Sequence, residues 1–363
     1  RVVWKIGKAG SLDRLRLVHE DLPAPGPGEV QIGVRAVGLN FADIFACQGL
    51  YSATPQGEFT PGLEFAGVVL AVGDGLDDGR TRQAKKRSHS ELSAVQVGDP
   101  VMGVTRFGGY ASVLNIDSRY VVPLPSGWTM SQGAAFLCTT LTAYYGLVTL
   151  GHLQKDEVVL VHSAAGGVGL ASLDIIDALG AKSVATVGTD SKVDFLCQRA
   201  GLSKDQVIVR SGTAQFDSDL KRSLKSLGSE SVDVVMDSLQ GPLFNIAYDN
   251  LNRGGRHLVF GAAAMTPTGA RPNWIKLAWQ WLRRPRLDPL EMVSQNKAVI
   301  GYNLIWLWDR VELMHQILTD MMQCVKWRAP HVGHEFLLQE APRALRLLQS
   351  GKTVGKVVLT VKS

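Results

Sequence analysis

The sequence predicts an α/β protein of two domains, in which a Rossmann-type, doubly wound parallel sheet faces a β-rich domain across a cleft. The length of 363 residues is enough for about two domains. Strands punctuated by glycine and proline dominate residues 1–126, whereas strand and helix patterns alternate from about residue 157. A glycine-rich loop follows the first of these later strands, as in doubly wound folds that bind dinucleotides.

The composition is that of a globular protein with a full core, because 45% of the residues are hydrophobic and 20% are charged. The four cysteines are far apart and form no C-x-x-C pair, which argues against a disulfide framework or a clustered zinc site and for a reducing compartment. We therefore expect an intracellular protein, most simply a cytoplasmic one. A plastid or a mitochondrion stays open, because the chain starts at Arg1 without a methionine.

In the β-rich part, alternating residues predict strands over 29–40 and 108–117, and residues 62–75 predict a strand pair closed by a turn. Residues 120–154 contain no Asp, Glu, Lys or Arg. Because prolines, serines and threonines interrupt this segment, we expect one or two buried helices over 134–151 rather than a membrane span.

Six apolar, β-branched runs follow, and helical patterns separate most of them. They predict parallel strands over 158–163, 183–188, 206–211, 232–238, 257–262 and 298–303. The tail from about residue 309 begins with a helix over 309–323, continues through 334–351 and closes with a strand over 355–361. We expect the tail to return to the β-rich part.

The loop LVHSAAGGVG, residues 160–169, is the first functional signal. Ser163, Gly166 and Gly169 have the spacing of a dinucleotide loop, and they lie between a predicted strand and a predicted helix. Glycines let the backbone approach a pyrophosphate, and the helix N-terminus attracts the anion. The alternative is a tight turn without a ligand, which the surrounding strands make the weaker interpretation.

The end of the second predicted strand favours NADPH over NADH. An NAD site usually carries an acid there, but this strand ends in Gly188 and Thr189. Lys192 and Arg210 could hold a 2′-phosphate through charge-assisted hydrogen bonds. Two points oppose this interpretation: both cations could be solvated surface charges, and Asp190 is an acid close to the strand end.

The segments GLNFADIFACQGLY, PGLEFAGVVLAVG, VLVHSAAGGVG and GKVVL resemble the medium-chain dehydrogenase/reductase superfamily, and most closely its zinc-independent quinone oxidoreductase branch. RPNWIKLAWQWL and QNKAVIGYNL look closest to the vesicle amine transport protein subgroup. The resemblance covers nearly the whole chain. It implies a GroES-like catalytic domain over 1–126 and 309–363, a Rossmann cofactor domain over 127–308, and a homodimer.

The differences from zinc-dependent relatives point to a protein without a metal. Zinc alcohol dehydrogenases have a cysteine and a Gly-His-Glu where this chain has Asn40 and Gly62-Leu63-Glu64. The cysteine lobe that binds a structural zinc is also absent. Zinc needs four ligands, or three and a water, so we expect no metal site.

Without a metal, we expect hydride transfer from NADPH to a small molecule that needs little polarisation, namely a quinone or an α,β-unsaturated carbonyl compound. Tyr51 could donate a proton to the carbonyl oxygen, or it could be a loop tyrosine packed on its domain. The resemblance places Asn40 and Asp43 near the nicotinamide, although both could simply cap a turn. Some relatives have a tyrosine where this chain has Phe45, which cannot donate.

The expected cofactor-binding residues combine the glycine loop, the end of the second strand and positions implied by the resemblance. They are Thr142, Ser163, Gly166, Gly167, Val168, Gly169, Gly188, Lys192, Arg210, Gly261, Tyr302, Asn303, Leu304 and Lys356. A second hypothesis is a non-catalytic or weakly active NADPH-binding, membrane-associated protein of the vesicle amine transport type. Nucleic-acid binding would rest on the net charge of +5 alone and is not expected.

Two further segments are distinctive. Residues 80–87 carry five basic side chains and predict a mobile surface loop. Residues 274–286, WIKLAWQWLRRPR, predict an amphipathic helix that ends at Pro285. Such a helix could rest on an anionic membrane or cover the substrate cleft. We expect its tryptophans to be buried, at the cleft mouth or in a dimer interface, because a monomer rarely exposes so much aromatic surface.

Overall fold

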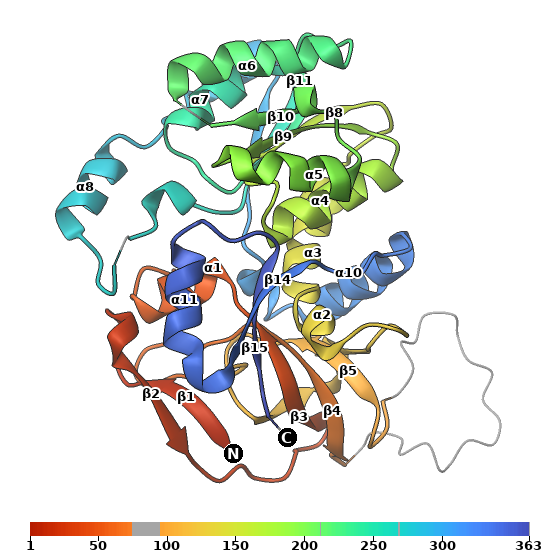
Figure 1. Cartoon of the computed structure of the whole chain (residues 1–363), viewed down its shortest axis with the longest axis vertical. Coiled ribbons are helices and arrows are strands. Elements are labelled where there is room, and N and C mark those ends of the chain that lie inside the picture. The colour runs from red at the N-terminus through yellow and green to blue at the C-terminus, as the bar shows by residue number, and fades with distance from the viewer. Residues whose placement is uncertain (75–94, 211, 268, 363) are drawn as a thin grey trace.

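The computed structural model describes residues 1–74, 95–210, 212–267 and 269–362. Two sheets organise the chain, and each has its own helices (Figure 1). The middle of the chain forms a six-stranded sheet, and the two ends of the chain together form a mixed sheet. The predicted α/β class with a doubly wound parallel sheet is therefore confirmed.

All six strands predicted for the second part of the chain are present, and every neighbouring pair is parallel. Their order is β10-β9-β8-β11-β12-β13, so the chain changes direction beside β8. Nucleotides bind at such a change of direction in open parallel sheets. The strands are β8 (Val158–Val161), β9 (Lys182–Val187), β10 (Val207–Val209), β11 (Val232–Asp237), β12 (Leu251–Val259) and β13 (Ala298–Gly301). The helices between them include α4 (Gly167–Ala178), α5 (Val193–Ala200), α6 (Thr213–Ser226) and α7 (Pro242–Asp249).

Strand β8 shows how this sheet buries both of its faces. Val159 and Val161 pack into the core that α4 shares, whereas Val158 and Leu160 pack into a second core with α6 and α7. All four side chains are buried. A strand covered on both faces is expected to be a continuous apolar run, and the sequence VVLV meets that requirement.

The mixed sheet has the order β14-β15-β3-β4-β5-β7, and β6 pairs with β3 beside this path. Its strands are β3 (Glu29–Gly38), β4 (Glu64–Val72), β5 (Pro100–Val104), β6 (Val113–Asp117), β7 (Val121–Pro123), β14 (Val332–Leu337) and β15 (Lys356–Thr360). A separate hairpin consists of β1 (Val2–Ile6) and β2 (Leu15–His19). The tail thus returns to the first part of the chain, as expected, and two short helices pack with it, α1 (Phe41–Cys47) and α11 (Ala341–Gln349).

The strand pair predicted over residues 62–75 is wrong, because residues 64–72 form the single strand β4. Gly67 lies inside this strand and pairs with Val34 of β3. A Cβ atom at Gly67 would collide with the carbonyl oxygen of Gly33. The glycine therefore allows two backbones to approach closely, which is a second reason for glycine in a strand besides a turn.

The uncharged segment 120–154 forms two buried helices and no membrane span. α2 (Met130–Ala134) packs on β3 and β4, and α3 (Leu137–Tyr144) packs against α4. A single π-helical stretch, Tyr145–Leu150, continues α3. α10 (Val311–Cys324) packs against α3 from the tail. No helix among the residues that the structure describes is long and apolar enough to cross a membrane.

The segment between β12 and β13 carries two helices, α8 (Trp274–Leu282) and α9 (Pro289–Gln295). α8 lies at the edge of the molecule (Figure 1). α8 ends shortly before Pro285, as predicted. Neither helix contains a buried residue. The expectation that the tryptophans of α8 are covered at the cleft mouth is therefore wrong for the single chain, because its apolar face is turned away from the protein. The basic segment 80–87 lies outside the described residues.

Candidate active site and cofactor site

The glycine loop joins β8 to α4 through a turn that only small residues can form. Ser163 has a positive φ of 54°, and Gly166 is the N-cap residue of α4. A Cβ atom at Gly169 would lie 2.5 Å from the Cα atom and 2.6 Å from the carbonyl oxygen of Ala164. Gly169 is thus required for the helix to pack against the turn, and the loop leaves the N-terminal N–H groups of α4 available for an anion.

The loop is tied to the tail of the chain at Gly355. The N–H group of Gly355 donates to the carbonyl oxygen of Ala165 at 2.7 Å. A Cβ atom at Gly167 would lie 2.8 Å from the side chains of both Lys356 and Thr139. Gly167 and Lys356 are therefore in direct contact, and the mixed sheet helps to hold the position of the loop.

Lys356 is the centre of a buried polar cluster between the two sheets. Its Nζ atom donates to Glu64 Oε1 at 2.7 Å, to Asn40 Oδ1 at 2.9 Å and to the carbonyl oxygen of Leu39 at 2.7 Å. Asn40 Nδ2 also donates to Glu64 Oε1, and the backbone N–H of Cys138 donates to Glu64 Oε2. Every donor of the ammonium group is satisfied, which a buried charge requires.

Asp43 is fully buried and holds the start of α1. Its carboxylate accepts hydrogen bonds from the backbone N–H of Asn40 at 2.8 Å and from the hydroxyl of Tyr110 at 3.1 Å. Burial raises the pKa of Asp43 to about 6, although both hydrogen bonds oppose this shift. These contacts match the capping alternative for Asp43. A direct part of Asp43 in catalysis stays a prediction.

Tyr51 and Asn303 meet across the two halves of the molecule. The hydroxyl of Tyr51 donates to Asn303 Oδ1 at 2.9 Å, although 252 residues separate them. Asn303 follows β13 and caps the short helix Leu304–Leu307. The ring of Tyr51 packs with a small apolar cluster of Ala42, Ala53, Leu63, Phe107, Cys138 and Ile305. Burial raises the pKa of the Tyr51 phenol above its ordinary value, so the group stays protonated at neutral pH.

Tyr302 and Thr142 also come together. The Tyr302 hydroxyl donates to the carbonyl oxygen of Thr142 at 2.9 Å, and a Cβ atom at Gly146 would collide with that hydroxyl. Gly146 lies in the π-helical stretch, and such irregular turns occur frequently at functional sites. The predicted group Thr142, Tyr302, Asn303 and Leu304 is thus one continuous region that joins the end of α3 to the end of β13.

Arg210 and Lys192 lie beyond the end of β9 in different environments. Arg210 Nη1 donates to Thr186 Oγ1 at 2.8 Å, and a Cβ atom at Gly188 would lie 3.4 Å from Arg210 Nη2. Burial lowers the pKa of Arg210 to about 10. The Nζ atom of Lys192 donates to the carbonyl oxygens of Gly351 and Thr353, each at 2.8 Å.

Lys192 is only 8% exposed, so the alternative of a solvated surface charge does not describe it. Burial, and then the charge of Arg210, lower the pKa of Lys192. The two cations are therefore close enough to repel each other. Asp190 is an exposed residue on the adjoining turn. An anion between the cations would relieve their repulsion.

Sequence reasoning missed two buried acids. Glu64 anchors the cluster of Lys356, and Asp237 ends β11 beside Gly261. Asp237 accepts hydrogen bonds from His257 Nε2 at 3.0 Å and from the backbone N–H groups of Leu239 and Gln240. Burial by itself would raise the pKa of Asp237, but these hydrogen bonds outweigh it and the pKa is about 2. An acid inside or at the end of an apolar run, as Glu64 in GLEFAGVV and Asp237 in VDVVMDS, was the available signal.

Comparisons with known proteins agree with this geometry. Residues 26–126 match the family described as alcohol dehydrogenase GroES-like domain, and residues 202–359 match the family described as zinc-binding dehydrogenase. The chain is 32% identical to the synaptic vesicle membrane protein VAT-1 homolog of Rattus norvegicus, over 96% of this chain and 81% of the relative. Two solved structures are similar: CurK enoyl reductase, with 28% identity, a TM-score of 0.78 and 99% of each chain covered, and Escherichia coli quinone oxidoreductase complexed with NADPH, with 27% identity, a TM-score of 0.74, and 99% of this chain and 100% of that chain covered.

The name of the second family concerns zinc, but the residues at the corresponding place do not fit a zinc ion. The carboxylate of Glu64 is already paired with the ammonium group of Lys356, and Asn40 and Leu63 replace the nitrogen and sulfur donors that zinc prefers. Among the described residues, no three His, Cys, Asp or Glu side chains are grouped as metal ligands.

Proposed function

Because this chain belongs to the medium-chain dehydrogenase/reductase superfamily and is quinone oxidoreductase-like, we propose that it is a zinc-independent reductase that uses NADPH to reduce a quinone or an α,β-unsaturated carbonyl compound. The proposal rests on the residues of this chain as well as on its relatives. The contact between Tyr51 and Asn303 is the observation that carries it.

The surroundings of Tyr51 suit an apolar carbonyl substrate. One phenol hydroxyl projects from a ring that packs among apolar side chains. These side chains offer a ligand apolar surface and a single hydrogen-bond donor, which suits a flat, conjugated carbonyl compound. Asn303 accepts a hydrogen bond from this hydroxyl. Because Asn303 follows β13, the bond fixes the phenol relative to the six-stranded sheet.

NADPH supplies the hydride when it is bound. The glycine loop would hold its pyrophosphate at the N-terminus of α4, and Arg210 with Lys192 would face its 2′-phosphate. We keep the predicted cofactor set, from Thr142 to Lys356, as part of this proposal. Lys356 would contribute to this site indirectly, because its side chain packs against Gly167 and so helps to fix the position of the glycine loop.

The chemistry left to the protein is the movement of one proton. After hydride addition to the β-carbon of an enone or to a quinone ring, negative charge develops on the carbonyl oxygen. The Tyr51 hydroxyl, which has one proton, would turn from Asn303 Oδ1 to donate that proton to the carbonyl oxygen, and water can return one to the phenolate. Burial keeps the pKa of Tyr51 above its ordinary value, which favours a donor over a base.

Tyr51→Phe tests the proposal. Consumption of NADPH should be measured with a panel of quinones and enones. The unmutated chain should oxidise NADPH with at least one compound of this class, and the variant should lose about 10²–10⁴-fold in kcat with little change in KM or in NADPH binding. Tyr120→Phe is the matched control, because that hydroxyl donates to the carbonyl oxygen of Trp308. If Tyr51→Phe and the parent had the same kcat, Tyr51 would not be the proton donor.

The second candidate is a weakly active or non-catalytic NADPH-binding protein of the vesicle amine transport type, associated with membranes. The relative from Rattus norvegicus, a synaptic vesicle membrane protein by name, favours it. Tight NADPH binding without turnover on the whole panel would support this candidate over the reductase. The homodimer implied by the resemblance stays a prediction, which the mass of the protein in solution checks.

A further inference from the structure

A row of polar side chains ends one face of the six-stranded sheet. Four neighbouring strands each contribute an apolar residue to the core on this face, namely Ile208, Val184, Leu160 and Val235. The residue two positions further along each strand is polar, and because side chains alternate along a strand it shares that face. These polar residues are Arg210, Thr186, His162 and Asp237. They lie at the carboxyl edge of the sheet, where open parallel sheets bind nucleotides.

Arg210 is held at its backbone and at one end of its guanidinium group. Its backbone N–H donates to the carbonyl oxygen of Val187 at 2.9 Å, which extends the pairing of β10 with β9. Its Nη1 atom donates to Thr186 Oγ1 at 2.8 Å, and its Nη2 atom lies beside Gly188. Among the described residues, Thr186 is the one side chain that accepts a hydrogen bond from Arg210. Most of the N–H groups of the guanidinium therefore stay available for a ligand.

The hydroxyl of Thr186 is itself held in one direction. A guanidinium group can only donate, so Thr186 accepts from Arg210 and keeps its own proton for another bond. His162 Nδ1 lies 3.1 Å from the same oxygen. It can accept that proton, because burial lowers the pKa of His162 to about 4 and keeps the ring neutral. Thr186 and His162 are 0% and 2% exposed, so the loss of either bond would leave a buried polar group unsatisfied.

We propose that Thr186 is a positioning residue for the recognition of the 2′-phosphate of NADPH. Thr186 does not touch the phosphate; it holds Arg210 Nη1, so that the other N–H groups face the space beside Gly188. A long, flexible arginine is thereby ordered before the cofactor arrives, which lowers the entropy cost of binding. This inference rests on the cofactor site of the proposed function and adds a residue that determines its specificity.

The alternative is a structural role, in which Thr186 only satisfies a buried donor of Arg210. Its loss would then lower the melting temperature without changing the choice between NADPH and NADH. The ratio of the two affinities therefore distinguishes positioning from structure.

Cofactor titration of the full chain tests the positioning role. Thr186→Val keeps the shape of the side chain but removes its oxygen, and it should weaken NADPH binding about tenfold, the lower end of what one charge-assisted hydrogen bond contributes. Its affinity for NADH, which lacks the 2′-phosphate, should stay within about threefold. Thr186→Ser restores the hydroxyl and should bind NADPH as the parent does. An unchanged ratio of the two affinities in Thr186→Val would overturn the proposal.

A double-mutant cycle separates positioning from direct contact. If Thr186 acts through Arg210, adding Thr186→Val to Arg210→Ala should cause no further loss of NADPH affinity. Additive losses would show that Thr186 meets the cofactor by itself and would overturn the proposal. Should Thr186→Val not fold, Thr186→Cys, whose sulfur is a weak acceptor, gives the same comparison.

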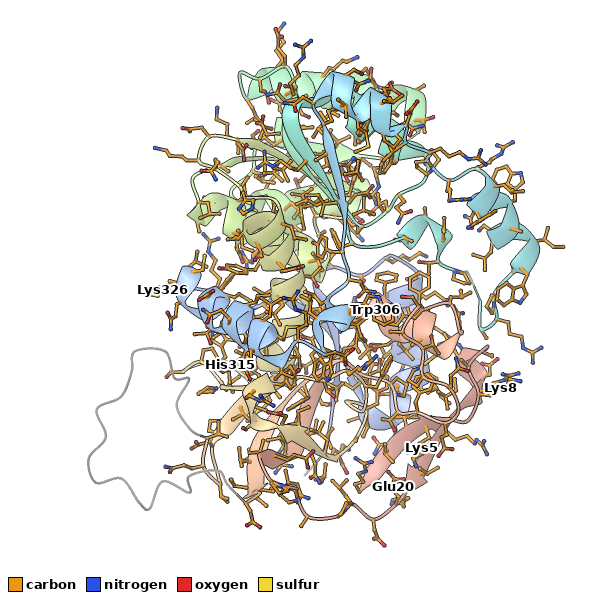
Figure 2. The ribbon with its side chains drawn as sticks, turned by 180° about the vertical axis from the view of Figure 1, so that it is seen from behind. Lys5, Lys8, Glu20, Trp306, His315 and Lys326 are labelled. Atoms are coloured by element: carbon orange, nitrogen blue, oxygen red, sulfur yellow. The ribbon has the colours of Figure 1, made fainter. Side chains whose placement is uncertain are left out.

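The matched control is Thr319→Val, which should leave both affinities unchanged. Thr319 is also buried, and its hydroxyl donates to the carbonyl oxygen of His315 at 2.9 Å. Both residues belong to α10, outside the six-stranded sheet, and Figure 2 shows His315 on that helix.

The titration needs no substrate, so its outcome is independent of turnover. A parent that binds NADPH far better than NADH but reduces no quinone or enone would refute the reductase, and the Thr186 variants would still decide this proposal. A parent that binds both cofactors equally would overturn this proposal, because Arg210 would then not recognise the 2′-phosphate.

Discussion

Arg210 should decide the preference for NADPH over NADH. Its guanidinium group is partly buried beside Gly188 and donates to the neutral hydroxyl of Thr186. Arg210→Ala removes the cation but leaves Thr186 with a partner, because its hydroxyl lies 3.1 Å from His162 Nδ1. The variant should therefore fold, and its effect on cofactor binding can be separated from an effect on stability.

The expected magnitude follows from the bonds at stake. A charge-assisted hydrogen bond contributes about 1.5–3 kcal/mol, so the loss of one from Arg210 to the 2′-phosphate weakens NADPH binding about 10–150-fold. NADH lacks this phosphate, and its affinity should stay within about threefold, well under one such bond. Fluorescence titration of both cofactors into the same preparations measures the difference.

Lys192 provides an internal comparison. Its ammonium group already binds two backbone carbonyls near the tail, so one N–H group at most is left for a phosphate. Lys192→Met should weaken NADPH binding less than Arg210→Ala does, and it should lower the melting temperature more. Equal affinity of the parent for NADPH and NADH, or an equal loss for both cofactors in Arg210→Ala, would refute the reasoning.

Four more outcomes are expected. Gly169→Ala should destabilise the protein by about 1–3 kcal/mol and abolish cofactor binding, because its Cβ atom would overlap the turn before α4, whereas Gly301→Ala, with nothing within 4 Å, should be neutral in thermal unfolding. Lys356→Met should cost about 3–5 kcal/mol by leaving Glu64 buried without a partner, and adding Glu64→Leu should recover much of this in denaturant titrations; an additive further loss would contradict the pairing. Burial lowers the pKa of His162 to about 4, so its neutral form stabilises the fold above about pH 6.5 and on the order of 3 kcal/mol is lost as the pH falls through 4; His162→Leu should flatten that part of the stability profile, and an unchanged slope would show that another group is responsible. Metal analysis of the purified protein should find no stoichiometric zinc, and chelators should leave its activity unchanged; one tightly held zinc per chain would contradict the expected absence of ligands.

The six-stranded parallel sheet could be predicted from the sequence, because its strands and helices depend on the pattern of apolar and polar residues within short segments. Six apolar, β-branched runs with helical patterns between most of them leave few ways to build a sheet, and a loop such as SAAGGVG has few uses between a strand and a helix. Gly169 shows why: the close contact that requires it is made with Ala164, only a few residues away in the chain.

The polar contacts of the site were harder to predict, because they join distant segments. Nothing near Lys192 indicates that its ammonium group meets the backbone at Gly351 and Thr353. Likewise, the burial of Glu64 depends on Lys356 from the last strand. The exposure of the α8 tryptophans in the single chain could not be predicted, because a pattern of apolar residues does not show which side of a helix the protein covers. Their burial in a dimer interface stays a prediction.

The place of β15 in the mixed sheet has a consequence for biosynthesis. β15 lies between β14 and β3, and its Lys356 contacts Leu39 across 317 residues. A ribosome that adds about 5–20 residues per second needs about 15–60 s to cover that distance. During this interval the complete Rossmann sheet can form, but β3 is paired with β4 along one edge, while its other edge is paired only over residues 29–33, with β6, and is open over residues 36–38, where β15 will pair. Open edges invite wrong pairing, so the nascent chain needs protection at β3 until its tail arrives. A circular permutant that begins at β14 would shorten this exposure, because β14 and β15 would then leave the ribosome before β3.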